Sequence, residues 1–129
     1  EFRKAPQSNA SGVNTPMQYG IAQYMARPAS YEGLAGFYQA KRDLFRAGLA
    51  DSRLKLLPSS GSFFQCMDIS QVSDLPDTEF CQWLTREIKV AAIPLSAFYA
   101  DGFDQRVVRF CYAKQDDTLR EALQRLRGL

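Results

Sequence analysis

Histidine is absent from all 129 residues of this chain. Because histidine is the usual base beside a serine or cysteine nucleophile and the commonest metal ligand, its absence excludes Ser-His and Cys-His catalysis and histidine-ligated metals. Cysteine is scarce, with Cys66, Cys81 and Cys111 far apart along the chain. An odd number at such spacings predicts reduced, buried thiols rather than a disulfide framework or a zinc site.

Net charge is also small. Lysine and arginine number 16 and are interspersed with 14 acidic residues, which leaves a net charge of +2. Nucleic acids and membrane surfaces bind concentrated basic faces, so neither is an expected partner. No apolar run approaches the roughly 20 residues of a membrane-spanning helix, and no signal peptide opens the chain. We therefore expect a cytoplasmic protein, and the absence of an initiator methionine at Glu1 suggests a piece of a longer chain.

The N-terminal third of the sequence predicts two helices. The first dozen residues, "EFRKAPQSNASG", are polar and are expected to be irregular or disordered. A helix then begins with Thr15 as N-cap, Pro16 at the first position and Gln18 completing a capping box. Its apolar face consists of Met17, Ile21, Tyr24 and Met25. A second, longer helix is predicted from Tyr31 to about Ala50, with Ser30 as its N-cap.

Short strands dominate the rest of the chain. The stretches "LKLLP", "SFFQCMDI" and "RVVRFCYA" read as strands, and "VAAIP" as a buried one. A helix over residues 78–89, an aromatic turn in "LSAFYADGF" and a final helix capped by Asp116 complete the pattern. This order predicts an α+β fold in which helices pack on a small sheet of short, mainly antiparallel strands.

One arginine stands within the apolar stretch "VVRFCYAKQDDTL". Strand alternation places Arg109 with Val107 and Cys111, away from the larger apolar face. The pattern alone favours a solvent-facing side chain on an exposed sheet face. The alternative is a bidentate anchor for a carboxylate, because the guanidinium fork matches that geometry.

Other candidate residues have ordinary structural interpretations. The aromatic residues of "SFF" and "SAFY" are most simply core, although they can also line an apolar pocket. The formal S-x-x-K match at Ser52–Lys55 lies between a helix and a strand, which favours an exposed structural lysine. Helix capping explains the candidate carboxylates, which are Asp74, Asp77, Glu79, Asp116 and Asp117. The sequence has no glycine-rich phosphate loop and no metal-ligand cluster.

Several segments together resemble one enzyme family. "VNTPMQYGIAQYM", "GSFFQCMDIS", "DTEFCQWLTREIKVAAIPLSAFYADGF" and "VVRFCYAKQDDTL" are similar to the C-terminal part of class I/II aminotransferases. These are pyridoxal-phosphate enzymes of fold type I, and the likeness is greatest to the methionine and kynurenine–glutamine aminotransferase branch. The resemblance implies that residues 1–29 end the large cofactor-binding domain and that residues 30–129 form the small C-terminal domain.

The resemblance also implies roles for individual residues. Arg109 matches the arginine that clamps the α-carboxylate of the substrate. The substrate pocket would further include Phe63, Phe64, Ser96, Phe98 and Tyr99. Asn14 and Thr15 match a helix start near the dimer interface and the cofactor site of the partner subunit. No residue matches a metal ligand.

The implied activity is amino-group transfer between an amino acid and a 2-oxo acid in a homodimer, with pyridoxal 5'-phosphate as cofactor. The aromatic pocket favours a large apolar or aromatic amino acid resembling methionine. The Schiff-base lysine, the aspartate on the pyridine nitrogen and the phosphate-binding residues have no match in these 129 residues. The chain alone is therefore expected to hold no catalytic residue, to bind no cofactor and to be inactive. The alternative is a non-catalytic carboxylate-binding or assembly module.

Two stretches depart from the family pattern. "APQSNASG" is small and polar where relatives carry aromatic or branched residues, and Gln65 is polar on a strand that is apolar in relatives. We therefore expect the packing around the first dozen residues to differ from that of the family.

Overall fold

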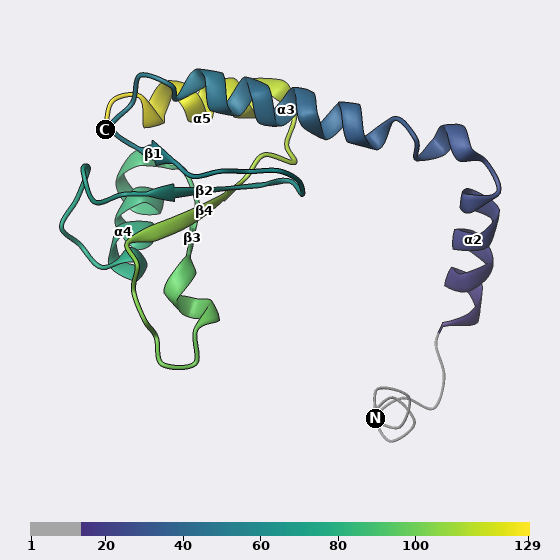
Figure 1. The fold of residues 1–129 in the computed structure, drawn as a ribbon, viewed down its shortest axis with the longest axis horizontal. Coiled ribbons are helices and arrows are strands. Elements are labelled where there is room, and N and C mark those ends of the chain that lie inside the picture. The colour runs from purple at the N-terminus through teal and green to yellow at the C-terminus, as the bar shows by residue number, and fades with distance from the viewer. Residues whose placement is uncertain (1–13) are drawn as a thin grey trace. The chain divides into compact units, whose positions relative to one another are not determined.

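A computed structural model describes residues 14–129, and the expectations for the first dozen residues lie outside that range. The chain divides into two compact units, of which the first ends at Ala35 and the second runs from Gly36 to Leu129. The predicted order of helices and strands is confirmed, and the fold is α+β (Figure 1).

Helix α2 (Thr15–Met25) lies in the first unit. Its N-cap is Asn14, whose carboxamide oxygen accepts a hydrogen bond from the backbone N–H of Met17 at 3.1 Å. The predicted Thr15 cap is therefore wrong by one position. The side chain of Asn14, not that of Thr15, accepts the hydrogen bond from a free N–H of the first turn. None of the residues of α2 is buried, including those of its predicted apolar face.

The second predicted helix begins later than expected. A 3₁₀ turn, η1 (Pro28–Ser30), precedes α3 (Leu34–Gly48). Ser30 is not the N-cap of α3, because α3 begins only at Leu34 and Ser30 is the last residue of the 3₁₀ turn, where its N–H donates to the carbonyl of Arg27 at 2.8 Å. The predicted C-terminal residues also fall outside α3, since Leu49 and Ala50 form a turn after Gly48.

The sheet has four antiparallel strands in the order β1-β2-β4-β3. Their bounds are β1 (Lys55–Leu56), β2 (Phe64–Asp68), β3 (Ile93–Pro94) and β4 (Val107–Cys111). In β4, Arg109 lies opposite Cys66 of β2 on one side and Ile93 of β3 on the other. The prediction of a buried strand over "VAAIP" is wrong, because β3 is an edge strand that pairs with β4; none of the five residues of this stretch is buried, and Ile93 is 41% exposed.

Helices cover one face of this sheet. Helix α4 (Asp77–Trp83) continues into a π-helical turn, η2 (Leu84–Ile88), so the predicted extent over residues 78–89 is nearly matched. The aromatic turn is the 3₁₀ helix η3 (Leu95–Phe98). The last helix is α5 (Asp116–Leu126), and its N-cap is Gln115 rather than Asp116. The carboxylate of Asp116 instead accepts a hydrogen bond from Lys41 Nζ at 2.8 Å, and this contact lowers the pKa of that carboxyl.

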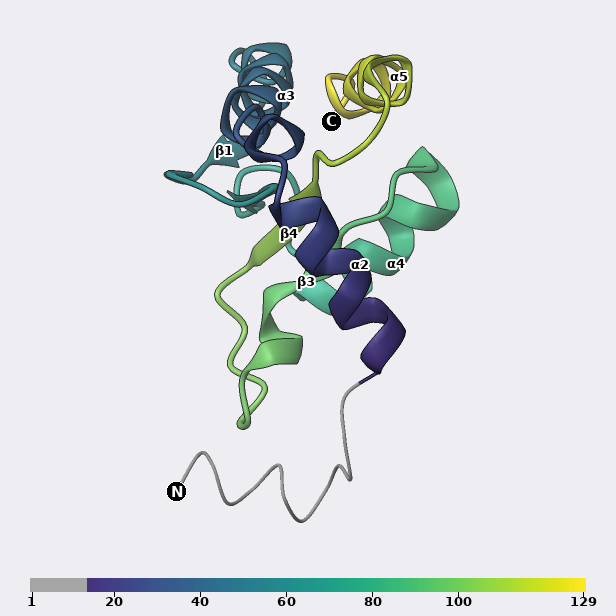
Figure 2. The same ribbon diagram turned by 90° about the vertical axis from the view of Figure 1, so that its right-hand side faces the viewer.

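Helices α3 and α5 lie side by side, as both views show (Figures 1 and 2). A β-carbon at Gly48 would come within 2.5 Å of Leu123 Cδ1, so glycine permits this close approach. The buried core draws on β2, β4, α3, α4 and α5, with Phe45, Met67, Phe80, Val108, Phe110, Leu123 and Leu126 among its members. Within residues 14–129 no helix is long and apolar enough to cross a membrane.

Candidate functional site

Arg109 occupies the middle of β4, on the sheet face away from the core. Its guanidinium carbon lies 4.0 Å from the ring centroid of Phe64 and 4.7 Å from that of Phe98. Among residues 14–129 no carboxylate lies within ion-pair distance of Arg109, and its buried Nε has no hydrogen-bond partner there. Arg109 thus contacts two aromatic rings, while its guanidinium N–H groups remain available to bind an acceptor.

This geometry decides what Arg109 can do chemically. Aromatic rings attract the flat faces of a guanidinium, but they provide no hydrogen-bond acceptor for the N–H groups in its plane. Those N–H groups match the two oxygens of a carboxylate in a bidentate pair. The stacked arrangement therefore supports the carboxylate anchor over the solvent-facing arginine that the sequence pattern favoured.

The four aromatic residues of the candidate pocket are not core, contrary to the simplest interpretation of the sequence. Phe98 is 59% exposed, Phe63 and Tyr99 are exposed to about the same lesser degree, and Phe64 is half-buried. Phe63 precedes β2, Phe64 begins β2, Phe98 ends η3 and Tyr99 follows it. Phe63 and Phe64 touch at a centroid distance of 4.5 Å, which extends the aromatic surface beside Arg109.

Ser96 is placed differently from the other predicted pocket residues. It is buried, and its hydroxyl donates to Asp77 Oδ1 at 2.6 Å while its backbone N–H donates to Asp77 Oδ2 at 2.8 Å. The hydroxyl is thus engaged within the protein. Since Ser96 belongs to η3, this contact fixes the short helix that carries Phe98 over Arg109.

Asp77 is the residue that sequence reasoning missed. It was interpreted as a helix cap, but it is 1% exposed, and both its oxygens bind Ser96. Its own N–H donates to Asp104 Oδ2 at 2.9 Å. No local pattern signals this role, because the two partners come from different elements, α4 and η3, that meet only in the folded domain. Asp74 remains an exposed surface residue that pairs with Arg106 at 3.3 Å.

The remaining candidates fit their structural interpretations. Lys55 is exposed and lies 4.0 Å from Asp68 Oδ2, as expected of a surface lysine. Asn14 and Thr15 form the start of α2 in the first unit, where the carboxamide oxygen of Asn14 is engaged in capping. Within residues 14–129 no group of side chains is placed to hold a metal ion.

The cysteines are free thiols, with Cys81 buried and Cys66 and Cys111 half-buried. Burial, together with the nearby charge of Asp77, raises the pKa of Cys81 to about 12. Because the thiolate is the form that reacts, we expect Cys81 to resist alkylation by iodoacetamide at pH 8 in the native protein. Peptide mapping by mass spectrometry checks this. Labelling of Cys81 in the folded protein as fast as in urea would contradict it.

The fold is shared with solved aminotransferases. A methionine aminotransferase of Escherichia coli superposes with a TM-score of 0.88 at 48% identity, over 98% of this chain and 34% of that one. The N-succinyldiaminopimelate aminotransferase of Mycobacterium tuberculosis gives a TM-score of 0.83 at 35% identity, over 98% of this chain and 33% of that one. The architecture is therefore shared with about a third of each of these enzymes.

The chain belongs to the family of class I and II aminotransferases, whose family model matches residues 3–126. Among curated proteins, it is 48% identical to methionine aminotransferase of Escherichia coli, over 100% of this chain and 34% of that protein. It is 30% identical to rat kynurenine–oxoglutarate transaminase 3, over 92% of this chain and 30% of that protein. The chain thus spans about a third of the length of these relatives.

Proposed function

We propose that this chain is the C-terminal part of an aminotransferase that moves an amino group between an amino acid and a 2-oxo acid. Residues 30–129 form the small domain, and residues 1–29 end the large domain. Arg109 binds the α-carboxylate that both substrates carry. The observation that carries the proposal is the guanidinium in contact with the rings of Phe64 and Phe98, with its buried Nε unpaired.

We infer that the preferred amino acid has a large apolar or aromatic side chain, as methionine does. The exposed rings of Phe98, which contacts Arg109, and of Phe63, which contacts Phe64, form a surface of the kind that binds apolar groups, and the exposed Tyr99 follows Phe98 directly in the chain. The names of the relatives, which include a methionine and a kynurenine transaminase, agree with this class. The homodimer, with Asn14 and Thr15 near the cofactor of the partner subunit, belongs to the same proposal.

Members of this family use pyridoxal phosphate, which supplies an electron sink for amino-group transfer. We expect the present residues alone to bind no cofactor, because none matches the lysine to which the family attaches it. Lys41 is committed to Asp116 and to the carbonyl of Lys114, and the exposed Lys55 pairs with Asp68. The sequence also contains no glycine-rich phosphate-binding motif. The residues around Arg109 bind and orient the substrate, and this positioning lowers the activation free energy of the reaction.

We expect residues 1–129, purified by themselves, to show no transaminase activity and to leave the absorbance spectrum of added pyridoxal phosphate unchanged. The physical reason is that no lysine here occupies the position that binds the cofactor. A titration followed between about 300 and 450 nm checks this, with the complete enzyme as positive control. A saturable new band at one cofactor per chain would contradict the expectation.

A non-catalytic carboxylate-binding module is the second candidate, because both rings that contact Arg109 come from this chain. Weak methionine binding by the chain alone, lost in Arg109→Ala and without any cofactor band, would favour the module. The gene upstream of Glu1 separates the two. An open frame with the lysine motif supports the aminotransferase, and a start codon at that point supports the module.

A further inference from the structure

The segment between β1 and β2 carries Phe63 and leads directly into Phe64, the first residue of β2, whose ring contacts Arg109. Residues 57–63 have no regular secondary structure, and Ser62 has a left-handed backbone with φ of 62°. An irregular segment keeps its shape only if other groups satisfy its backbone donors and acceptors. The position of Phe63 and Phe64 therefore depends on contacts from outside the segment.

A polar pair, the buried Gln65 and the half-buried Arg46, holds the start of this segment. Gln65 is 0% exposed and lies on the core face of β2. Its side-chain nitrogen donates to the carbonyls of Leu57 and Cys66, both at 2.7 Å, and its oxygen accepts from Arg46 Nη1 at 2.6 Å. The same Nη1 of Arg46 also donates to the carbonyl of Leu57 at 2.9 Å. The carbonyl of Leu57, the first residue of the segment, thus accepts hydrogen bonds from both α3 and β2, and the contact between Arg46 and Gln65 joins these two elements to each other.

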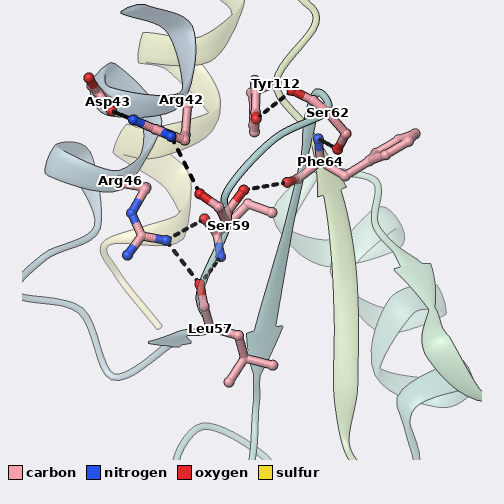
Figure 3. A network of polar contacts seen from close by, with 9 residues as sticks. Arg42, Asp43, Arg46, Leu57, Ser59, Ser62, Phe64 and Tyr112 are labelled. Carbon is pink, nitrogen blue, oxygen red and sulfur yellow. Dashed lines mark hydrogen bonds and ion pairs between the residues drawn. The ribbon is translucent and has the colours of Figure 1, made fainter. Parts of the chain in front are cut away.

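Further contacts hold the middle and the end of the segment, as Figure 3 shows. Arg42, one helical turn before Arg46, donates to the carbonyl of Ser59 at 3.4 Å. The hydroxyl of Ser59 donates to the carbonyl of Phe64 at 3.2 Å, and that of Tyr112 donates to the carbonyl of Ser62 at 2.9 Å. The segment is thus fixed from α3 at one end and from Tyr112 at the other.

The Arg46–Gln65 pair carries a desolvation cost on folding that an apolar residue at position 65 would not. The amide of Gln65 is fully desolvated and the guanidinium of Arg46 partly so, whereas a leucine at position 65 would fill the core at no such cost. In return, the pair fixes the position of Phe64, the residue next to Gln65 in β2. Because successive side chains of a strand point to opposite faces, holding Gln65 in the core holds Phe64 against Arg109.

We propose that Arg46 and Gln65 are positioning residues for the carboxylate site. They touch no substrate and act through the carbonyl of Leu57 and the ring of Phe64, which keeps the guanidinium of Arg109 oriented. This inference rests on the proposed function of Arg109.

The test uses the complete, cofactor-loaded enzyme with methionine and 2-oxoglutarate as substrates. Gln65→Leu is expected to raise KM for both substrates about five- to tenfold, because both carry the carboxylate, while kcat changes less than about twofold. The absorbance of the bound cofactor stays as in the wild type. Arg46→Lys keeps one donor toward Leu57 and is expected to raise KM by only about two- to threefold.

Leu123→Ala is the matched control, since it weakens the core at α5 and lies outside this network. It is expected to lower the unfolding temperature while leaving both KM values unchanged. If Gln65→Leu behaves in the same way, the pair is structural only and the inference is wrong. If Gln65→Leu does not fold, Arg46→Lys decides, and an unchanged KM in that variant overturns the inference.

Arg109→Lys in the same assay separates the two proposals. A rise in KM for Arg109→Lys with none for Gln65→Leu or Arg46→Lys overturns only the positioning role. An unchanged KM for Arg109→Lys overturns the proposed carboxylate anchor, and the positioning role with it.

Discussion

Arg109→Lys in the complete enzyme is expected to raise KM for the amino-acid substrate roughly 10- to 100-fold, because a bidentate charged pair is lost. A lysine ammonium is a point charge without flat faces, so it neither stacks against the rings of Phe64 and Phe98 nor matches both carboxylate oxygens. Steady-state kinetics with methionine checks this, and the 2-oxo acid should show a similar rise because it carries the same carboxylate.

Arg120→Lys is the control for this change. Arg120 lies on α5, away from β4, and it is exposed. The same replacement there is expected to leave both KM values within about twofold. Unchanged kinetics in Arg109→Lys would return Arg109 to the role of a solvent-facing arginine.

Asp77→Ala is expected to lower the free energy of unfolding by about 3 kcal/mol, because it leaves the buried N–H and hydroxyl of Ser96 without an acceptor. Urea unfolding measures this loss. The same change frees η3, so KM for the amino acid should rise as Phe98 leaves Arg109.

Two further variants make this test specific. Asp77→Asn keeps one acceptor oxygen and is expected to lose less stability than Asp77→Ala. Asp74→Ala removes a neighbouring but exposed carboxylate, and its effect should stay within about 0.5 kcal/mol. Equal losses for Asp74→Ala and Asp77→Ala would contradict the role assigned to the buried pair.

Periodicity was enough to predict the framework. The stretch "SFFQCMDI" was correctly predicted to be a strand, and a final helix was correctly predicted near Asp116. These patterns succeed because helices and strands repeat at fixed intervals and one face of each is buried. The caps were less predictable, since neighbouring residues compete for the same donors, as Asn14 and Thr15 do at α2.

The candidate site was not predictable from the same patterns. Aromatic residues are usually buried, so the sequence favoured core positions for Phe63 and Phe98, both of which are exposed. Asp77 resembles a helix cap until its partner, Ser96, is brought to it by the packing of η3 against α4. Pattern alone also favoured a solvent-facing Arg109. The family resemblance, rather than periodicity, pointed to a carboxylate.

The pairing of β2 with β4 has a consequence for how the site forms during folding. Phe64 and Arg109 come from strands roughly forty residues apart, so bringing them together requires a long loop to close at an entropic cost. Phe98 is much nearer to Arg109 along the chain, and pairing of that kind forms more readily. One ring can therefore reach the arginine early, whereas the second arrives only with the central strands of the sheet. The complete carboxylate site therefore forms only when the whole sheet has folded. A partly folded chain would expose its aromatic rings before both of them contact Arg109.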